Sequence, residues 1–406
     1  MSFNFSKITD RLPIPETLKR LPSSLEEGGA LTKVVDYATN MVSRHWKPDS
    51  FVLSDLTPYR IIASTGLMSV RYYPPLAEST IAVEGEPLTV ISEQRAMPIL
   101  MVPPLGVSAW IFDLLEERSL VKYMLAHGYP VYLVDWGEPD RSHAHLSLED
   151  YVLDWLPEAV ASVKAHSNSR DEVCEISMLG YCMGGLLTLL YVASAQDDEV
   201  KNVVTVASPI DFHASGTHGK LMGYLREPLN ELARVTRFSL SHLNPLLFHT
   251  SGERLSWLFK MTNPMSNVTS YFDLLINMAD KNYVATHMTM SRWFNEMVDY
   301  PGATLQNIMA KMLLDNQMAR GYVGLGMEKV PLKNIKANLL TLAGSADRIV
   351  GIKAARRAMD VVSSEDKLFE VVPGGHAGVF AGAKAPANTW SSIIKWLDKR
   401  SYTLHK

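Results

Sequence analysis

Short apolar runs alternate with helical patterns over two parts of this chain of 406 residues, 61–212 and 332–406. Each run is bounded by Gly, Pro or polar residues, as buried strands commonly are. Strands that are apolar throughout and alternate with helices are typical of a parallel sheet covered on both faces. The pattern therefore predicts an α/β fold. Its strands are expected at residues 98–103, 130–135, 173–179, 202–207, 338–344 and 367–372, and the first four of them are expected to be buried.

Two stretches before this series alternate between apolar and other residues, at 68–73 and 88–92. Alternation of this kind predicts strands with one buried face. The breakers Pro74-Pro75 and Glu84-Gly85 lie between the two stretches. We expect them to be two antiparallel strands at the start of the sheet.

The remaining two parts of the chain lack this strand pattern. Residues 1–60 are rich in Pro, Ser and charged side chains, and we expect an N-terminal extension with one amphipathic helix near 31–44. In residues 213–331 large apolar side chains recur at helical spacings, which predicts a helical cap inserted into the core. These side chains include Leu255, Leu258, Phe259, Trp293, Phe294 and Met297.

The stretch from Glu172 to Ala195 joins an apolar strand to a helix that is apolar on nearly every face. The turn between them reads Gly180-Tyr181-Cys182-Met183-Gly184-Gly185. This is the layout of the nucleophile elbow of α/β-hydrolases, with cysteine in place of the usual serine; the glycines are needed because the turn is too tight for side chains. Cys182 is therefore the candidate nucleophile. The alternative is an inert core cysteine, which is what free cysteines usually are.

Two late strands each lead into a residue that completes this chemistry. Asp347 follows the strand at 338–344, and His376 follows the strand at 367–372. The order Cys182, Asp347, His376 is the order nucleophile, acid, histidine of α/β-hydrolases. In such a triad His376 takes the thiol proton, while Asp347 holds the imidazole tautomer. Taken alone, Asp347 could cap a helix and His376 could be a loop histidine, but order and context together favour the triad.

An oxyanion hole is expected beside the nucleophile. The backbone N–H of Met183 would lie at a helix N-terminus, where free N–H groups stabilise negative charge. In α/β-hydrolases the loop after an earlier strand provides a second N–H. Gly106 and Val107, after the strand at 98–103, are the candidates. The predicted cap would cover this site and exclude water from it.

Composition narrows the class of protein. The formal net charge is −4 and no basic run stands out, so a nucleic-acid partner is not expected. Cys174 and Cys182 are the only cysteines, which indicates a reducing compartment, and the cytoplasm is the expected location.

Neither a secretory signal nor a membrane span is expected. The N-terminus has no apolar signal segment, and the longest uncharged stretch, 176–196, contains the elbow glycines, which indicate a buried strand and helix. No group of His, Cys or carboxylate residues has metal-ligand spacing, so no metal or other cofactor is expected. His143 and His145 are expected to be a solvated pair.

Five motifs in order resemble those of polyhydroxyalkanoate synthases, and the likeness is closest to the short catalytic subunits of the class III type. It covers about residues 98–400. The motifs are LVDWGEPD, GYCMGG, NVVTVASPIDF, AGSADRIV and PGGHAGVF. Two positions depart from the family pattern: Arg348 stands where the family usually has His, and Gly351 where it usually has Pro.

The resemblance implies an enzyme that polymerises 3-hydroxyacyl-coenzyme A into a polyester and releases coenzyme A. The family's catalytic residues carry over onto Cys182, Asp347 and His376. In the family the aspartate is often assigned to activating the hydroxyl of the incoming monomer, so this role and the orientation of His376 both stay open for Asp347. The family works as a homodimer at the surface of a cytoplasmic polymer granule, and its class III type needs a second, non-catalytic subunit. Monomer length stays open.

Two other functions stay open beside the synthase. A cysteine hydrolase, either a thioesterase or a polyester depolymerase, would use the same triad to deliver the acyl group to water. A catalytically silent granule protein is disfavoured by the complete set of triad residues. Cysteine favours the synthase, because an acyl group moved from one thioester to another keeps its transfer potential and can be passed to a hydroxyl.

Overall fold

A mixed sheet of eight strands forms the centre of the computed structural model, in the order β1-β2-β8-β5-β9-β10-β13-β14. The structure describes residues 36–41, 53–167, 174–215, 243–261 and 276–401, together with residues 219, 223, 224, 240 and 274. The pairs β1–β2 and β2–β8 are antiparallel, and the other five pairs are parallel. The predicted α/β fold with a mostly parallel sheet is confirmed.

The buried strands of the sheet coincide with the apolar runs of the sequence. β9 is displaced most from its expected range, because it begins at Ile176 and continues to Tyr181, next to the elbow cysteine. The strands of the central sheet are β1 (Arg60–Thr65), β2 (Met68–Tyr73), β5 (Ile99–Val102), β8 (Val131–Asp135), β9 (Ile176–Tyr181), β10 (Val200–Val206), β13 (Asn338–Gly344) and β14 (Lys367–Val372).

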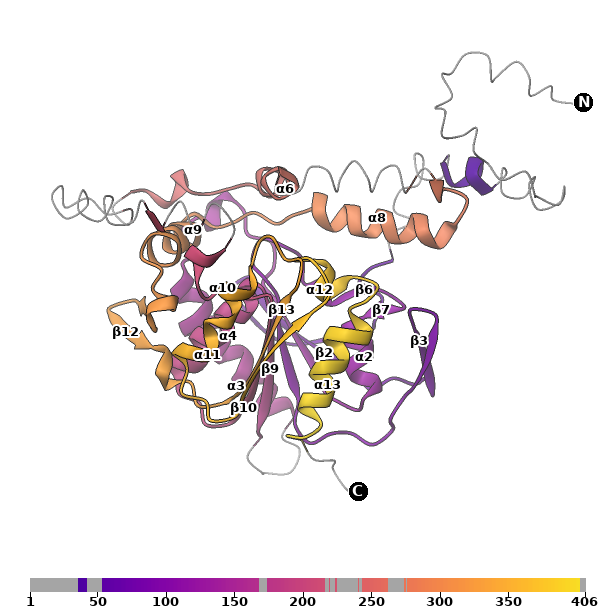
Figure 1. The fold of residues 1–406 in the computed structure, drawn as a ribbon, viewed down its shortest axis with the longest axis horizontal. Helices are drawn as coiled ribbons and strands as arrows, with labels where there is room; N and C mark the ends of the chain where they lie inside the picture. The colour runs from indigo at the N-terminus through magenta and orange to yellow at the C-terminus, as the bar shows by residue number, and fades with distance from the viewer. Residues whose placement is uncertain are drawn as a thin grey trace, which may run out of the picture.

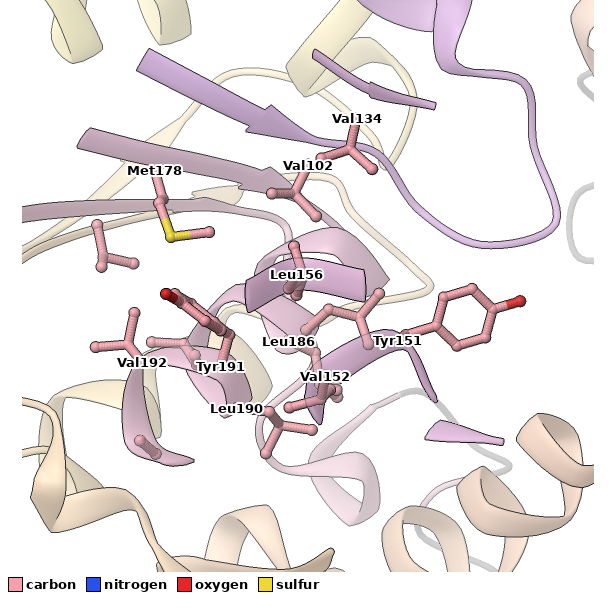
Figure 2. Packing of buried hydrophobic residues seen from close by; sticks show 14 of the residues in the cluster. Val102, Val134, Tyr151, Val152, Leu156, Met178, Leu186, Leu190, Tyr191 and Val192 are labelled. Atoms are coloured by element: carbon pink, nitrogen blue, oxygen red, sulfur yellow. The ribbon is translucent and has the colours of Figure 1, made fainter. Parts of the chain in front are cut away.

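Helices cover both faces of this sheet (Figure 1). They are α2 (Leu120–Ala126), α3 (Leu156–Ser167), α4 (Met183–Ala195), α10 (Ile352–Arg356), α11 (Ala358–Val361), α12 (Gly378–Ala381) and α13 (Ser391–Leu397). Alternate residues of β5 belong to two different cores: Leu100 and Val102 pack with α3 and α4, whereas Ile99 and Met101 pack with α2 and α13. Figure 2 shows part of the first core. Both faces of the central strands are therefore buried, which explains their apolar runs, whereas the edge strands β1 and β14 are partly exposed.

One predicted strand pairing is wrong. The stretch at 88–92 does not pair with β2; it overlaps β4 (Glu86–Thr89), which forms a separate hairpin with β3 (Thr80–Val83). Glu84 and Gly85 have positive φ angles of 49° and 81°, as the two-residue turn of a hairpin requires, so local pairing prevails. β2 pairs instead with β1, a partly exposed edge strand that carries no continuous apolar run.

A second hairpin lies where the sequence shows no strand signal, near the end of residues 213–331. It consists of β11 (Tyr322–Leu325) and β12 (Glu328–Pro331), and its short strands turn at Gly326, whose φ is 58°. Four-residue strands are too short to show a reliable alternation. A further small hairpin pairs β6 (Asp113–Leu115) with β7 (Arg118–Ser119). The division of the chain into extension, core and cap stays a prediction.

Two helices, α6 (Gly252–Met261) and α8 (Lys281–Asn295), lie along one end of the sheet (top of Figure 1). They are followed by α9 (Gly302–Asn307). Of the amphipathic helix expected near 31–44, residues 36–41 are helical and the rest lie outside the described residues. Among the helices that the structure describes, none is long and apolar enough to span a membrane.

The start of α4 packs directly on the sheet because its second and third residues are glycines, Gly184 and Gly185. A Cβ atom on Gly184 would lie 2.0 Å from the carbonyl oxygen of Val102 in β5. A Cβ atom on Gly185 would lie 2.0 Å from the hydroxyl oxygen of Ser208. On Gly180, at the end of β9, it would lie 2.4 Å from the Cα of Gly185. The elbow glycines are therefore required by close backbone contacts, as the sequence predicts.

Gly184→Ala should destabilise the protein by about 3 kcal/mol, because the new methyl group can only be accommodated by moving α4 away from β5. Gly378→Ala is the matched control: Gly378 begins a helix, and a Cβ atom there has no neighbour within 4 Å. The control should be neutral or stabilised by up to about 1 kcal/mol. Urea unfolding of both variants measures the difference, and equal stability of the two would contradict this account of the turn.

Candidate active site

Cys182 lies at the turn between β9 and α4 in a backbone conformation that non-glycine residues rarely adopt. Its φ is 52° and its ψ is −119°. Such a conformation costs about 1–3 kcal/mol and persists only where the surroundings impose it. Here the N–H of Cys182 donates to the carbonyl of Val206 at 2.8 Å, and its carbonyl accepts from the N–H of Gly185 at 3.1 Å. The residue therefore has the strained geometry of a nucleophile elbow.

Asp347 and His376 meet beside this turn. The Nδ1 atom of His376 lies 2.8 Å from Oδ2 of Asp347, whose side chain is fully buried. The other carboxylate oxygen accepts the backbone N–H groups of Ile349 at 2.8 Å and Val350 at 2.9 Å. Both oxygens of Asp347 are thus engaged, and the aspartate fixes the orientation of the imidazole ring.

The loop that carries His376 is anchored to the residue before the cysteine. The hydroxyl of Tyr181 donates to the carbonyl of His376 at 3.1 Å. The Tyr181 ring stacks on Phe380 of α12, with ring centroids 4.3 Å apart and 10° between the planes. Tyr181 is buried, so this connection is shielded from water. It sets the distance between the cysteine turn and the histidine loop.

His376 is in contact with Cys182 on its other side. Burial by itself would lower the pKa of His376, but the negative charge of a Cys182 thiolate and hydrogen bonds to Asp347 and Cys182 prevail and raise it to about 10. Because this value exceeds the ordinary 6.5, the proton stabilises the folded state. The stabilisation is complete below pH 6.5 and is lost as the pH rises through about 10.

A cavity of about 300 Å³ opens over the sulfur atom. Its walls are mostly apolar and come from the loop after β5, from the elbow, and from α6, α8 and the segment that follows α8. The lining residues are Pro104, Leu105, Gly106, Val107, Tyr181, Cys182, Met183, Leu255, Leu258, Trp293, Met297, Tyr300 and His376. An apolar cavity with a few convergent polar groups is the usual form of a small-molecule site.

The three residues expected at the oxyanion hole lie in this cavity wall. Met183 is the first residue of α4, and Gly106 and Val107 follow β5, the strand next to β9. Gly106 has a φ of 77°, and its carbonyl accepts the N–H of Val298 at 3.0 Å. Within the described residues, the N–H groups of Met183 and Val107 donate to no recorded acceptor. They are therefore available to a ligand.

The position of the cavity in the sheet also follows a general rule. The chain leaves β5 toward β8 on one side, and leaves β9 toward β10 on the other. Ligands of open α/β sheets bind at such a switch point, outside the carboxyl ends of the strands. The cavity lies there, between the β5 loop and the elbow after β9.

Four apolar residues named in the predicted cap, Leu255, Leu258, Trp293 and Met297, lie in the upper wall of the cavity. Sequence reasoning did not single out Tyr300, which also lines it. Trp293 and Tyr300 are largely buried, at 3% and 8% exposure. The signal in the sequence was only the helical spacing of apolar residues, which does not say what they face.

The described residues contain no group of three or more His, Cys, Asp or Glu side chains that could hold a metal ion. The two histidines noted in the sequence differ in their contacts: Nδ1 of His143 lies 2.8 Å from a carboxylate oxygen of Asp140, whereas His145 is exposed. Cys174 and Cys182 are both free thiols.

Comparison with known proteins agrees with this geometry. A family model described as the alpha/beta hydrolase fold matches residues 98–383. The poly(3-hydroxyalkanoate) polymerase subunit PhaC of Allochromatium vinosum is 30% identical over 320 residues, which cover 78% of this chain and 83% of that protein. The PhaC subunit of Thiocystis violacea is 31% identical over 306 residues, 75% of this chain and 81% of that protein. The PhaC subunit of Synechocystis sp. is 28% identical over 313 residues, 77% of this chain and 80% of that protein.

The resemblance to polyhydroxyalkanoate synthases that the five motifs carry is confirmed by these relatives, which match most of the chain and most of their own length. The α/β-hydrolase fold is confirmed by the family model and by the sheet order. This chain belongs to the α/β-hydrolase fold family and, within it, to the PhaC family of poly(3-hydroxyalkanoate) polymerase subunits.

Proposed function

We propose that this chain is an acyltransferase that polymerises 3-hydroxyacyl-coenzyme A into a polyhydroxyalkanoate and releases coenzyme A. The observation that carries the proposal is a cysteine at the elbow, in contact with a histidine that a buried aspartate holds, in a chain of the PhaC family. Cys182 is the nucleophile, His376 the base and Asp347 the residue that orients the base.

The first half of the reaction loads the cysteine. His376 takes the thiol proton, and the thiolate of Cys182 forms a bond to the acyl carbonyl carbon of the thioester. The carbonyl electron pair moves to oxygen, where the N–H groups of Met183 and Val107 stabilise it. When the carbonyl re-forms, the bond to the sulfur of coenzyme A breaks, and His376 returns the proton to that sulfur.

The second half forms the ester bond. The hydroxyl of a bound 3-hydroxyacyl-coenzyme A attacks the acyl group on Cys182 while His376 takes the hydroxyl proton. The carbon–sulfur bond to Cys182 breaks, so the chain, longer by one unit, is attached to coenzyme A. Cys182 then takes the chain back as in the first half. Each cycle forms one ester bond and releases one coenzyme A. Of its two acyl transfers, the one onto Cys182 connects thioesters of similar energy, and the one onto the hydroxyl forms the ester.

Asp347 acts through His376 and not on the monomer hydroxyl. Its side chain is fully buried, one of its oxygens binds two backbone N–H groups, and the other binds Nδ1 of His376. A hydroxyl could reach this carboxylate only by displacing the imidazole. The remaining ring nitrogen of His376 serves both the thiol and the hydroxyl in turn.

Exclusion of water separates a polymerase from a hydrolase with the same residues. The acyl group on Cys182 survives until the next monomer arrives only if water does not reach it first. The apolar walls that α6 and α8 place over the sulfur support this role, through Leu255, Leu258 and Trp293. We include in the proposal the features that the family resemblance implies: a homodimer, a second non-catalytic subunit, and a place at the surface of cytoplasmic polymer granules.

Incubation of the purified chain with 3-hydroxybutyryl-coenzyme A should release free coenzyme A and deposit insoluble polyester. Cys182→Ala should release coenzyme A at least about 10³-fold more slowly, because no acyl-enzyme can form. Cys174→Ala is the control and should retain the activity, because Cys174 lies two residues before the start of β9, at the end away from Cys182. Thiol release with only monomeric 3-hydroxybutyrate as product would favour the hydrolase instead; normal turnover by Cys182→Ala would refute the nucleophile.

The contact with His376 should make Cys182 the more reactive thiol. At pH 7.5 iodoacetamide should alkylate Cys182 faster than Cys174, because burial raises the pKa of the Cys174 thiol. His376→Ala should slow the alkylation of Cys182 about tenfold or more and leave that of Cys174 unchanged. Peptide mass spectrometry follows both sites in one sample, and equal rates at the two cysteines would contradict the thiol–imidazole contact.

Asp347→Asn distinguishes the two roles of the aspartate. If Asp347 orients His376, the first acylation of Cys182, measured as a stoichiometric burst of coenzyme A, should slow by about 10³-fold or more. If Asp347 served only the monomer hydroxyl, the burst would keep its rate and later turnovers alone would slow. Asp360→Asn is the control, since Asp360 is exposed and pairs with Arg357 away from the cavity.

A further inference from the structure

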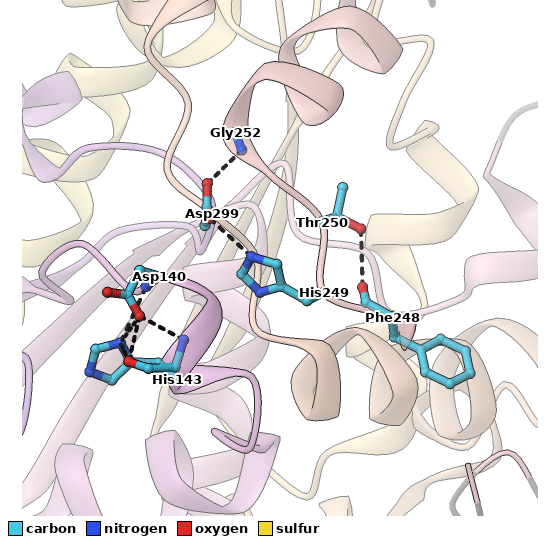
Figure 3. Close-up of polar contacts among 8 residues, drawn as sticks. Asp140, His143, Phe248, His249, Thr250, Gly252 and Asp299 are labelled. Atoms are coloured by element: carbon cyan, nitrogen blue, oxygen red, sulfur yellow. Dashed lines mark hydrogen bonds and ion pairs between the residues drawn. The ribbon is translucent and has the colours of Figure 1, made fainter. Parts of the chain in front are cut away.

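A second histidine–aspartate pair lies next to the cavity wall, formed by His249 and Asp299 (Figure 3). Nε2 of His249 lies 3.0 Å from Oδ2 of Asp299, and the His249 side chain is only 9% exposed. The other oxygen of Asp299 accepts the N–H of Gly252 at 2.8 Å. Gly252 is the first residue of α6, so one carboxylate joins α6, the residues before it and the segment after α8.

Backbone hydrogen bonds around this pair extend the connection. Thr250 and Tyr300 form an isolated antiparallel bridge, with N–H to carbonyl distances of 3.2 and 2.8 Å. The N–H of Val298 donates to the carbonyl of Gly106 at 3.0 Å. The hydroxyl of Ser256 in α6 donates to the carbonyl of Phe294 in α8 at 2.6 Å. The segment around Asp299 therefore contacts α6 and the β5 loop, and α6 in turn contacts α8.

Each of the joined segments contributes to the cavity over Cys182. Leu255 and Leu258 come from α6, Met297 and Tyr300 from the segment around Asp299, and Gly106 from the β5 loop. The fit is tight: a Cβ atom on Gly252 would lie 1.7 Å from the carbonyl oxygen of Met297, and one on Gly106 would lie 2.9 Å from the Tyr300 ring. A shift at the joint therefore reaches the cavity wall directly.

His249 depends on Asp299 for its orientation. Its Nδ1 atom is buried and has no hydrogen-bond partner in the part of the chain that the structure describes. Loss of the carboxylate would also remove the hydrogen bond of Nε2, so that neither ring nitrogen would keep a partner within the described residues, and the side chain would be free to change its orientation. His249 is thus held in one arrangement by Asp299, whose side chain is 31% accessible, and α6 and the segment around Asp299 share this contact.

We propose that His249 and Asp299 are positioning residues of the active site, which hold α6 and the β5 loop at the distance from Cys182 that acyl transfer requires. They touch neither the sulfur nor the imidazole. Their loss moves Gly106 and Val107 away from the developing oxyanion and opens the apolar wall to water. This inference rests on the proposed function for its polymer readout.

The chain provides a matched control pair. Asp140 and His143 are joined through Nδ1 at 2.8 Å, and Figure 3 shows both pairs in one view. The Asp140–His143 pair is exposed, with 69% of the Asp140 side chain and 31% of the His143 side chain accessible, and its hydrogen bonds stay within one short turn. It has the same chemistry without the connection between segments.

The test compares Asp299→Asn, His249→Gln and the double variant with wild type and Asp140→Asn. Acylation of Cys182 is measured as the coenzyme A burst with 3-hydroxybutyryl-coenzyme A and, independently of polymerisation, as the 4-nitrophenol burst with 4-nitrophenyl butyrate. Both bursts should slow about 10- to 100-fold in each single variant, because a displacement near 1 Å has that effect on a positioned reaction. The double variant should be no slower than the slower single one by more than about twofold, since the two residues act as a unit.

Two further readouts separate positioning from a general loss of structure. Iodoacetamide should alkylate Cys182 in the variants at least as fast as in wild type, because the contact with His376 remains and the opened wall admits the reagent. The amount of free 3-hydroxybutyrate formed for each coenzyme A released should rise severalfold. Asp140→Asn should match wild type in every measurement.

Unchanged bursts in both single variants would overturn the inference, as would effects that multiply in the double variant. So would slower alkylation of Cys182 in proportion to the slower bursts, because that result assigns the pair to overall folding. If wild type forms no polymer but the nitrophenyl ester burst slows as expected in the variants, the proposed function fails and the positioning role stands.

Discussion

The structure depends on one backbone constraint, the turn that reverses the chain between β9 and α4. Cys182 adopts a φ of 52° there, and the turn is possible only because Gly180, Gly184 and Gly185 leave room for backbone against backbone. The close approach brings the N-terminus of α4 to the end of β5, so that the N–H of Met183 and the loop at Gly106 face the same cavity. Strain at Cys182 is thus balanced by the close packing of α4 on the sheet.

The charges behind the cysteine are arranged in a row inside an apolar environment. A fully buried carboxylate, an imidazole in contact with it and a sulfur atom follow one another, and both oxygens of Asp347 are engaged. In surroundings of low polarity a positive imidazolium is stable only between two negative groups, which is why the pKa of His376 rises despite burial. The same arrangement places the sulfur of Cys182 next to a group that can take up a proton and return it.

The parts of this fold that the sequence predicts are those encoded within a few residues. The buried strands follow from apolar runs, the elbow from its glycines, and Asp347 and His376 from the strands that precede them. β1 and the hairpins β6–β7 and β11–β12 were not predicted, because a short strand with a weak apolar pattern does not show in the sequence which strand it pairs with. At Glu84 and Gly85 the turn favours the local β3–β4 hairpin over pairing with β2. A cap over the cysteine could be expected from the apolar residues of 213–331, but its detailed contacts could not, because a helical pattern gives the apolar face of α6 or α8 and not the residues that this face meets.

The same reason hides the pair of His249 and Asp299, which are 50 positions apart and resemble any other polar residues in loops. Their importance follows from what the neighbouring residues do. The carbonyl of Gly106 accepts a hydrogen bond from the N–H of Val298, next to Asp299, and the N–H of Val107, a residue of the cavity wall, belongs to the same peptide unit. Since a peptide unit is planar and rigid, a bond at that carbonyl also fixes the direction of that N–H. The helices over the cavity and the backbone that would stabilise an oxyanion are therefore held by a single connection, and neither can move without the other.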